Sequence, residues 1–295
     1  MYFVALASTL LFASSLTLTF ADAAAGTEIA NRAEPGKQTL SYGTNKAQSL
    51  DFWRASNTRG PAPLVLFVHG GGWTRGSKDN ATGRDKAPHY TREGYNFASI
   101  NYRLVPEATV EQEAQDVANA LASLVKRAEA LGIDRHRIVL MGHSAGAHLV
   151  ALVGTDPQYL RAAGLSESDI AGIVPIDGAA YDVAAQMQAS GGRWMRNMYG
   201  DAFGTDPARQ RSLSPTLQAG APNAPSFLIL HVQRPDGIAQ SEALAAALRK
   251  AGTPVAIEGF PGTGLQGHMT INRRLGDPNY AATPVVDGWL KRVFA

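Results

Sequence analysis

The sequence predicts an α/β fold in which a doubly wound, mostly parallel sheet is covered by helices on both faces. Two observations predict it. Continuous apolar runs recur along the chain, as expected for strands buried on both faces, and segments with helical periodicity lie between them. The 295 residues, 45% hydrophobic and 18% charged, suit one large domain better than two small ones. A chain of this length can bury an extensive core.

The predicted strands fall into two groups. Residues 39–42 and 49–53 are short alternating segments on either side of Gly43 and predict an N-terminal antiparallel hairpin. The apolar runs of the parallel part follow. They cover residues 64–68, 96–102, 137–141, 170–176, 227–232 and 255–260.

Helical patterns separate these runs. Residues 110–131 repeat apolar side chains such as Val117 and Leu121 on one face and are followed by a glycine, which favours a helix end. Residues 145–153 and 239–251 form two further predicted helices.

A long stretch after the helical pattern at 145–153 breaks the alternation. Residues 155–220 contain short helical pieces and many glycines. We expect a small lid-like insertion within about residues 178–220, inside one domain that covers residues 38–295.

The first residues are expected to lie outside this domain. Residues 3–20 are apolar and uncharged, and they lead into the small side chains of residues 21–25, which suit a signal peptidase. We predict a signal peptide over residues 1–23, a flexible leader over 24–37, and a secreted or periplasmic protein. No Lys or Arg precedes the apolar run, so a misassigned start codon or an uncleaved anchor is the alternative.

The composition argues against several classes of partner. The net charge is +2 and no run of Lys or Arg forms a basic patch, so nucleic acid is not expected. The chain has no cysteine, which excludes disulfides and a lipoprotein anchor. After the leader no apolar stretch approaches the roughly 20 residues of a membrane span, so no stable membrane association is expected. Without H-E-x-x-H or clustered His, no metal site or cofactor is predicted.

The sharpest catalytic signal is the G-x-S-x-G segment at residues 142–146, which lies between a predicted strand and a predicted helix. A serine on a tight strand-to-helix turn has a strained backbone, and the two glycines avoid collisions with neighbouring elements. Such a turn raises the hydroxyl above the sheet. The sequence therefore predicts Ser144 as a nucleophile.

A second glycine-rich segment, His-Gly-Gly-Gly-Trp at residues 69–73, follows the strand at 64–68. Consecutive glycines expose backbone N–H groups, and each such donor can contribute roughly 3–4 kcal/mol to the stability of an oxyanion in the transition state. A phosphate-binding loop is the rival interpretation, but neither a G-K-[S/T] continuation nor G-x-G-x-x-G is present. The segment precedes the serine, as the strand–turn–helix serine hydrolases require.

Together these motifs resemble those of the hormone-sensitive-lipase-like carboxylesterases and their bacterial relatives. The resemblance covers roughly residues 40–295. The segments that carry it are HGGGW at 69–73, NYRLVPE at 101–107, GHSAG at 142–146, and the short segments YG at 42–43 and QSLD at 48–51.

The resemblance implies an α/β-hydrolase fold and a reaction that needs no cofactor. It also implies that the N–H groups of Gly71, Gly72 and Ala145 form the oxyanion hole. His69 and residues 102–103 would support the site without taking part in the chemistry.

A serine hydroxyl is a weak nucleophile and needs a general base. In this fold the order is serine, acid, histidine, with the histidine in a loop after the last strand. Of the seven histidines, only His231 and His268 lie well beyond the serine. His231 falls inside the apolar strand at 227–232. His268 follows the strand at 255–260 in a glycine-rich loop, and its continuation resembles the H-x-x-I-N ending of the family. His268 is the predicted base.

Two aspartates compete as the acid that orients the imidazole. Asp236 follows the penultimate strand and precedes a helix, as the resemblance implies, and it is the first assignment. However, residues 231–236 are one residue longer than the family's H-G-x-x-D and lack its glycine. Asp177, at the end of the strand at 170–176, is the alternative because some hydrolases place the acid one strand earlier.

Large side chains near the insertion are candidates to line an acyl or aryl pocket, and ordinary packing against the sheet is the alternative. The candidates are Trp73, Trp194, Met198 and Tyr199.

The predicted function is a serine carboxylesterase that hydrolyses short-chain or small aromatic esters through an acyl-enzyme. Two alternatives remain. One is an arylformamidase-like hydrolase with the same triad. The other is a binding protein on a hydrolase fold, against which the complete Ser, His and acid set argues.

Overall fold

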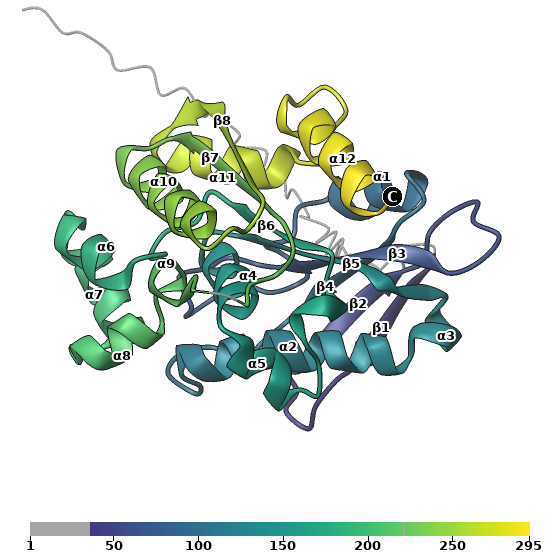
Figure 1. Cartoon of the computed structure of the whole chain (residues 1–295), viewed down its shortest axis with the longest axis horizontal. Helices are drawn as coiled ribbons and strands as arrows, with labels where there is room; N and C mark the ends of the chain where they lie inside the picture. Colours follow the sequence, from purple (N-terminus) through teal and green to yellow (C-terminus); the bar gives the residue numbers. More distant parts are fainter. Residues whose placement is uncertain (1–35, 221) are drawn as a thin grey trace, which may run out of the picture. The chain divides into compact units, whose positions relative to one another are not determined.

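The computed structural model describes residues 36–220 and 222–295. It confirms the predicted fold class, a mostly parallel sheet between two layers of helices (Figure 1). The predicted signal peptide at 1–23 and residues 24–35 of the predicted leader lie outside the described residues. The described residues belong to one compact unit.

Eight strands form one sheet in the order β1-β2-β4-β3-β5-β6-β7-β8. The predicted hairpin is present: β1 and β2 pair antiparallel, and β2 pairs antiparallel with β4. All other neighbours are parallel. The strands are β1 (Lys37–Ser41), β2 (Ser49–Trp53), β3 (Ala62–Val68), β4 (Asn96–Ile100), β5 (Ile133–His143), β6 (Gly172–Ile176), β7 (Phe227–Gln233) and β8 (Val255–Thr263).

The continuous apolar runs exist because the central strands are covered on both faces. Along β3, Leu64 and Leu66 belong to one hydrophobic cluster, whereas Val65 and Phe67 belong to the other. This alternation follows from the two-residue period of a strand. A half-exposed strand would need polar residues at every second position, and β3 has none.

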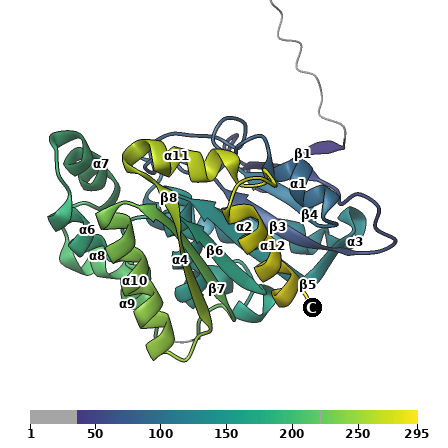
Figure 2. The same ribbon diagram turned by 90° about the horizontal axis from the view of Figure 1, so that it is seen from above.

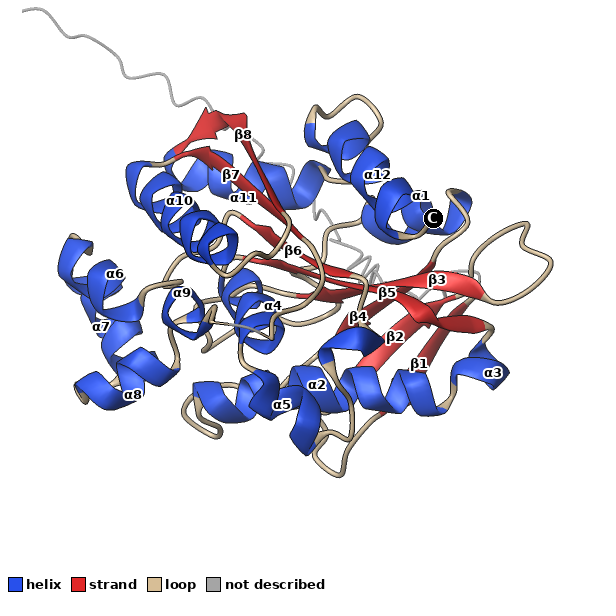
Figure 3. Ribbon diagram, in the orientation of Figure 1, coloured by secondary structure: helices blue, strands red, loops and turns tan. Residues whose placement is uncertain are grey.

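The helices divide between the two faces (Figure 3). One face carries α1, α11 and α12. The other carries α2, α4, α5 and α10, with the short α3 following α2. Their bounds are α1 (Lys86–Arg92), α2 (Val110–Lys126), α3 (Ala128–Leu131), α4 (Ala145–Thr155), α5 (Pro157–Ala162), α10 (Pro235–Lys250), α11 (Gly264–Arg274) and α12 (Ala282–Val293).

The predicted helix at 110–131 is two helices, α2 and α3. The first helix, α2, begins with a capping box, in which the side chains of Thr109 and Gln112 each accept a hydrogen bond from the other's backbone N–H. At Arg127 the backbone leaves helical geometry, and its N–H bonds only three residues back, to Leu124. Gly132 then ends α3 in the left-handed conformation, with φ 68°.

The segment between β6 and β7 contains the short helices that the sequence predicted there. They group beside α10, at the end of the sheet away from α3 (Figure 2). They are α6 (Val183–Ala189), α7 (Arg193–Phe203), α8 (Pro207–Ser212) and α9 (Pro215–Gln218). A further short helix, η1 (Glu167–Asp169), precedes β6 and contacts β5. None of the helices in the described part of the chain combines the length and the apolar character needed to cross a membrane.

Candidate active site

Ser144 lies on the turn between β5 and α4. Its backbone has φ 56° and ψ −119°, a region that non-glycine residues rarely adopt. A Cβ on Gly142 would lie 2.3 Å from the carbonyl oxygen of Gly146, and a Cβ on Gly146 would lie 2.2 Å from that of Val68. Only glycine fits at these two positions. The strained turn expected from G-x-S-x-G is therefore present, and it holds Ser144 at the carboxyl ends of the parallel strands.

His268 bridges the serine and a carboxylate. Its Nε2 lies 3.0 Å from Oγ of Ser144, and its Nδ1 lies 2.5 Å from Oδ2 of Asp177. A carboxylate can only accept here, so Nδ1 carries the hydrogen and Nε2 is free to take the serine proton. The His268 side chain is 11% exposed. The three side chains form an unbroken hydrogen-bonded line.

The element that carries His268 differs from the expected loop. The glycine-rich segment after β8 forms α11, and His268 lies in its second turn. The face of α11 that includes His268, Ile271 and Asn272 is buried. This packing against the sheet outweighs the low helix propensity of the glycines.

The acid that meets His268 is Asp177, so the first assignment, Asp236, is corrected by the geometry. Asp236 is the second residue of α10, and its Oδ2 accepts a hydrogen bond of 3.4 Å from Nε2 of Gln186. The extra residue between His231 and Asp236 carries β7 on to Gln233 and leaves the aspartate inside the helix. That extra residue and the missing glycine were the available signals.

Asp177 occupies its place because β6 lies next to β5 in the sheet. It directly follows β6 with φ 43°, and its N–H donates to the carbonyl oxygen of Leu230 at 2.6 Å. Its Oδ1 accepts from the N–H of Val232 at 3.0 Å. Both ends of the residue are thus tied to β7, which fixes the carboxylate against His268.

The environment of Asp177 favours its ionised form. Burial acts to raise its pKa, but the hydrogen bond from His268 and the charge of Arg234 outweigh burial and lower the pKa below its usual value. A carboxylate that stays ionised can stabilise an imidazolium beside it.

The glycine-rich segment 69–73 lies against the serine. A Cβ on Gly70 would lie 2.9 Å from Cβ of Ser144. Gly71 and Gly72 have φ 139° and 61°, which favour glycine. Within the described residues, the N–H groups of Gly71, Gly72 and Ala145 donate no hydrogen bond to another protein group. They are free for an oxygen bound at Ser144, as the resemblance implies.

Comparison with known proteins identifies the family. The BD-FAE family model matches residues 50–248, more than half of the chain. The chain belongs to the BD-FAE family. Several curated relatives of this BD-FAE protein are hydrolases. Esterase LipC of Mycobacterium tuberculosis is 32% identical over 207 residues, which are 67% of this chain and 51% of LipC. The chain thus spans about half the length of LipC.

Other relatives align over more of the BD-FAE chain. Kynurenine formamidase of Danio rerio is 27% identical over 263 residues, 88% of this chain and 84% of that protein. Among solved structures, esterase B from Lactobacillus rhamnosis has a TM-score of 0.71 at 20% identity, over 88% of this chain and 85% of its own. Esterase 2 of Thermogutta terrifontis has a TM-score of 0.69 at 21% identity, over 88% and 93%. These likenesses show the α/β-hydrolase fold.

In the BD-FAE domain, a second histidine supports the first. Nε2 of His143 donates to the carbonyl oxygen of His268 at 2.9 Å, and the two ring centroids are 4.4 Å apart. Burial, and then the charge of His268, hold the pKa of His143 well below its usual value. His143 therefore stays neutral and acts as a fixed donor to the backbone of α11.

A buried lysine holds the other end of the same helical face. Nζ of Lys86 donates to the carbonyl oxygen of Thr82 at 2.7 Å, to Oδ1 of Asn272 at 2.9 Å, and to the carbonyl oxygen of Asn272. Asn272 lies four residues after His268, one turn along α11. The lysine lies 4.7 Å from the centre of the Phe67 ring. No motif in the sequence marks Lys86 as part of the site, because a lysine on a short helix is usually exposed.

His69 has the supporting role that the resemblance implies. Its ring stacks on Tyr102 with centroids 4.4 Å apart, and its Nδ1 donates to the carbonyl oxygen of Gly70 at 2.8 Å. The Tyr102 hydroxyl donates to the carbonyl oxygen of His69 at 2.8 Å. Burial lowers the pKa of His69 to about 4. The pair fixes the start of the glycine-rich segment.

The predicted pocket residues divide into two pairs. Trp73 and Tyr199 are each 2% exposed and pack with Phe203, so for these two the packing alternative holds and the pocket assignment is corrected. Met198 lies beside the glycine-rich segment, whereas Trp194 lies beside Arg75, whose guanidinium carbon is 5.3 Å from the centre of the indole ring. A Cβ on Gly72 would lie 2.5 Å from Sδ of Met198, and Trp194 is 57% exposed.

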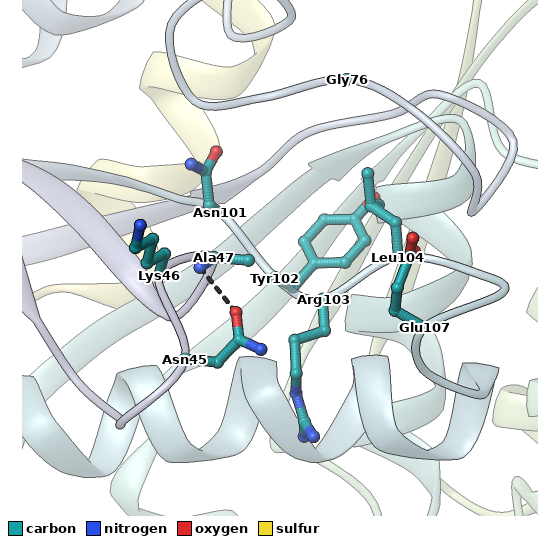
Figure 4. A pocket seen from close by; sticks show the side chains of 9 residues that line it. All are labelled: Asn45, Lys46, Ala47, Gly76, Asn101, Tyr102, Arg103, Leu104 and Glu107. Carbon is teal, nitrogen blue, oxygen red and sulfur yellow. Dashed lines mark hydrogen bonds between the residues drawn. The ribbon is translucent and has the colours of Figure 1, made fainter.

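Behind the glycine-rich segment lies a cavity of about 350 Å³ between the β1–β2 turn and the residues that follow β4 (Figure 4). Gly76 lines this cavity and also packs against the glycine-rich segment, since a Cβ on Gly76 would lie 2.3 Å from the carbonyl oxygen of Gly70. Within the described part of the chain, no group of three or more His, Asp and Glu side chains is placed to hold a metal ion. The cavity is lined by Asn45, Lys46, Ala47, Gly76, Asn101, Tyr102, Arg103, Leu104 and Glu107.

Proposed function

We propose that this protein is a serine carboxylic-ester hydrolase that works through an acyl-enzyme on Ser144. The observation that carries the proposal is the hydrogen-bonded line from Ser144 through His268 to Asp177. The esterases among its relatives and structural neighbours support it. The fold alone would not, because many functions share it.

The geometry suits a two-step mechanism. His268 Nε2 takes the proton of Ser144 as Oγ attacks the ester carbonyl, and Asp177 balances the charge of the imidazolium. The N–H groups of Gly71 and Gly72, with that of Ala145, hold the oxyanion. The carbon–oxygen bond to the alcohol then breaks, and the alcohol leaves with the proton from His268. Water repeats the sequence on the acyl-enzyme and releases the acid.

We propose short-chain or small aromatic esters as substrates. The thioether of Met198 lies directly over Gly72, which leaves limited room beside the acyl carbon. The large apolar side chains that are exposed in the described residues are Trp194, Leu217 and Leu265. They are single residues on three different helices and do not form the apolar helix face that docks on a lipid surface.

A panel of 4-nitrophenyl esters from acetate to palmitate tests this proposal, together with labelling by a fluorophosphonate. We expect labelling of the wild type, a kcat/KM that falls with acyl length, and loss of both labelling and turnover in Ser144→Ala. Turnover that survives in Ser144→Ala would exclude the mechanism. Activity that rises sharply once the substrate exceeds its solubility limit would indicate a lipase instead.

Hydrolysis of aromatic formamides is the second candidate. The observation that favours it is the match to kynurenine formamidase over 88% of this chain, against 67% for LipC. The same triad can cleave an amide if His268 protonates the leaving amine. The ratio of kcat/KM for an N-formyl aromatic amine to that for phenyl acetate decides between the two candidates, with Ser144→Ala as the background control.

We further propose that the protein is exported. The apolar, uncharged residues 3–20 and the small residues 21–25 support this. Mass spectrometry of the protein from its native host is expected to find a mature chain that starts at Ala24 or Gly26. An intact Met1 on the exported protein would contradict it.

A further inference from the structure

Arg234 lies against the carboxylate that His268 uses. Its Nε is 3.2 Å from Oδ2 of Asp177, the same oxygen that accepts from His268. Its Nη2 donates to the carbonyl oxygen of Gly178 at 3.4 Å. The side chains of Arg234 and Asp177 are 15% and 0% exposed. The ion pair is therefore largely shielded from water, where a charge–charge interaction is stronger than at the surface.

The local sequence brings the arginine to this place. Arg234 is the N-terminal cap residue of α10, and Pro235 begins the helix with a fixed φ. Gly237 leaves the necessary room, since a Cβ there would lie 3.0 Å from Nη2 of Arg234 and 3.4 Å from Oδ1 of Asp177. The segment that moves Asp236 away from the imidazole is the same one that carries Arg234 to the acid.

The charge of the arginine opposes the effect of the acid on the base. A carboxylate next to an imidazole stabilises the protonated ring, and a protonated ring cannot take the serine proton. A guanidinium on the same carboxylate oxygen offsets part of that negative charge. The guanidinium also restricts the movement of the Asp177 carboxylate, which is already tied to β7 by its hydrogen bond from the N–H of Val232.

We propose that Arg234 is a positioning residue that holds Asp177 against His268 and offsets part of its charge, so that the base stays unprotonated at lower pH than an unpaired carboxylate would allow. The inference rests on the proposed function of the triad. Arg234 acts through Asp177 and is not itself a catalytic residue.

Other titratable groups surround the triad and are common to every variant compared below. Burial holds the pKa of His143 below its usual value and the pKa values of Tyr181 and Tyr280 above theirs, so these three groups stay neutral near pH 7. Burial lowers the pKa of Lys86 to about 7. The groups are His143 from β5, Lys86 from α1, Tyr181 before α6, Tyr280 before α12 and Asp236 from α10.

The first test is the pH profile of kcat/KM in variants of Arg234. Arg234→Met removes the charge at similar length, and the midpoint of the acid limb is expected to rise by about half a unit to one unit. Arg234→Lys keeps the charge, and its midpoint is expected to lie close to that of the wild type. Arg137→Met is the matched control. It removes an arginine 2.7 Å from Asp134 near the start of β5 and is expected to leave the midpoint unchanged.

The second test does not need turnover. The hydrogen between Nδ1 of His268 and Asp177 gives a downfield proton resonance, and its pH titration reports protonation of the ring. We expect the midpoint to rise in Arg234→Met as it does in the kinetic profile. Arg234→Gln, which can still donate to Gly178, replaces the methionine variant if that variant does not fold.

The outcomes are separable. An unchanged midpoint in both measurements, with only lower thermal stability, would make Arg234 a purely structural residue and overturn the inference. Failure of the proposed function appears differently, as a wild type that neither turns over esters nor reacts with a fluorophosphonate. The resonance titration still reports on Arg234 in that case.

Discussion

His268 donates its Nδ1 hydrogen to Oδ2 of Asp177 across 2.5 Å, from a helix that follows β8 to a residue that directly follows β6. The two residues are 91 positions apart in the sequence. The order of strands in the sheet brings them together, because β6 lies beside β5, which ends at the serine turn. The acid of this triad therefore follows from sheet topology.

Exchange of this acid for its amide gives the first prediction. Asp177→Asn removes the anion that fixes the imidazole tautomer, and we expect kcat to fall by about 10³–10⁴-fold, as in the Ser-His-Asp template. KM should change little, because the loss belongs to the transition state. Asp236→Asn is the matched control and is expected to keep activity within a few-fold. The reverse pattern in well-folded variants, checked by circular dichroism, would restore Asp236 as the acid.

The strained backbone of Ser144 gives the second prediction. Glycine adopts φ 56° without the penalty that a side chain imposes. We expect Ser144→Gly to have a higher free energy of unfolding than Ser144→Ala, by about 1 kcal/mol, although neither variant has a nucleophile. Urea denaturation of the two inactive variants measures the difference. Equal stabilities would mean that the strain at this residue does not exceed the entropic cost of glycine in the unfolded chain.

Met198 gives a prediction on acyl-chain length. Its thioether lies over Gly72, so Met198→Ala should open space beside the acyl carbon. We expect the ratio of kcat/KM for octanoate to that for acetate to rise by about tenfold, the equivalent of one or two extra methylenes accommodated. Met187→Ala, in α6, controls for loss of core volume. A ratio that does not move would show that the acyl chain leaves the site in another direction.

Buried neutral histidines predict how stability depends on pH. Burial lowers the pKa of His69 and that of His148 to about 4 in the folded protein, against about 6.5 in the unfolded chain. Between these values the unfolded state binds more protons, so the free energy of unfolding falls as pH decreases from about 6.5 to 4. We expect each histidine to contribute about 2–3 kcal/mol to this loss.

His148→Gln tests the contribution of one histidine. Its Nε2 donates to the carbonyl oxygen of Leu213 at 2.8 Å, and a glutamine amide can donate in the same way without titrating. The wild type should be the more stable protein at pH 7, and its advantage should shrink toward pH 4. A gap that stays constant with pH would contradict the assigned protonation of His148.

The sequence predicted those parts of the site that depend on neighbouring residues. Ser144 and its two glycines form one local turn, so a five-residue motif was sufficient to find them. His268 was found from its position after the last strand, although its loop is a helix, because the buried face of α11 becomes evident only once the sheet is in place. Asp177 depends on which strand end lies beside the serine, and that is a property of the whole sheet.

The role of Lys86 could not be predicted from the sequence. Its partners are two main-chain oxygens and one side-chain amide oxygen. Two of the three belong to Asn272, which is 186 positions away in the sequence. No periodicity or motif marks such a contact, and an isolated lysine is most often exposed. The composition therefore gave no sign that a lysine amine lies in the core beneath the base.

The Lys86–Asn272 contact also has a consequence for how this protein can change over evolutionary time. A residue without a donor at position 86 would leave the carbonyl oxygens of Thr82 and Asn272 unpaired in a dry interior, and an apolar side chain at 272 would remove one of the three acceptors of the lysine amine. Either single step passes through a damaged intermediate. We therefore expect the two positions to covary among descendants of this chain, so that a lineage replaces both residues together or keeps both.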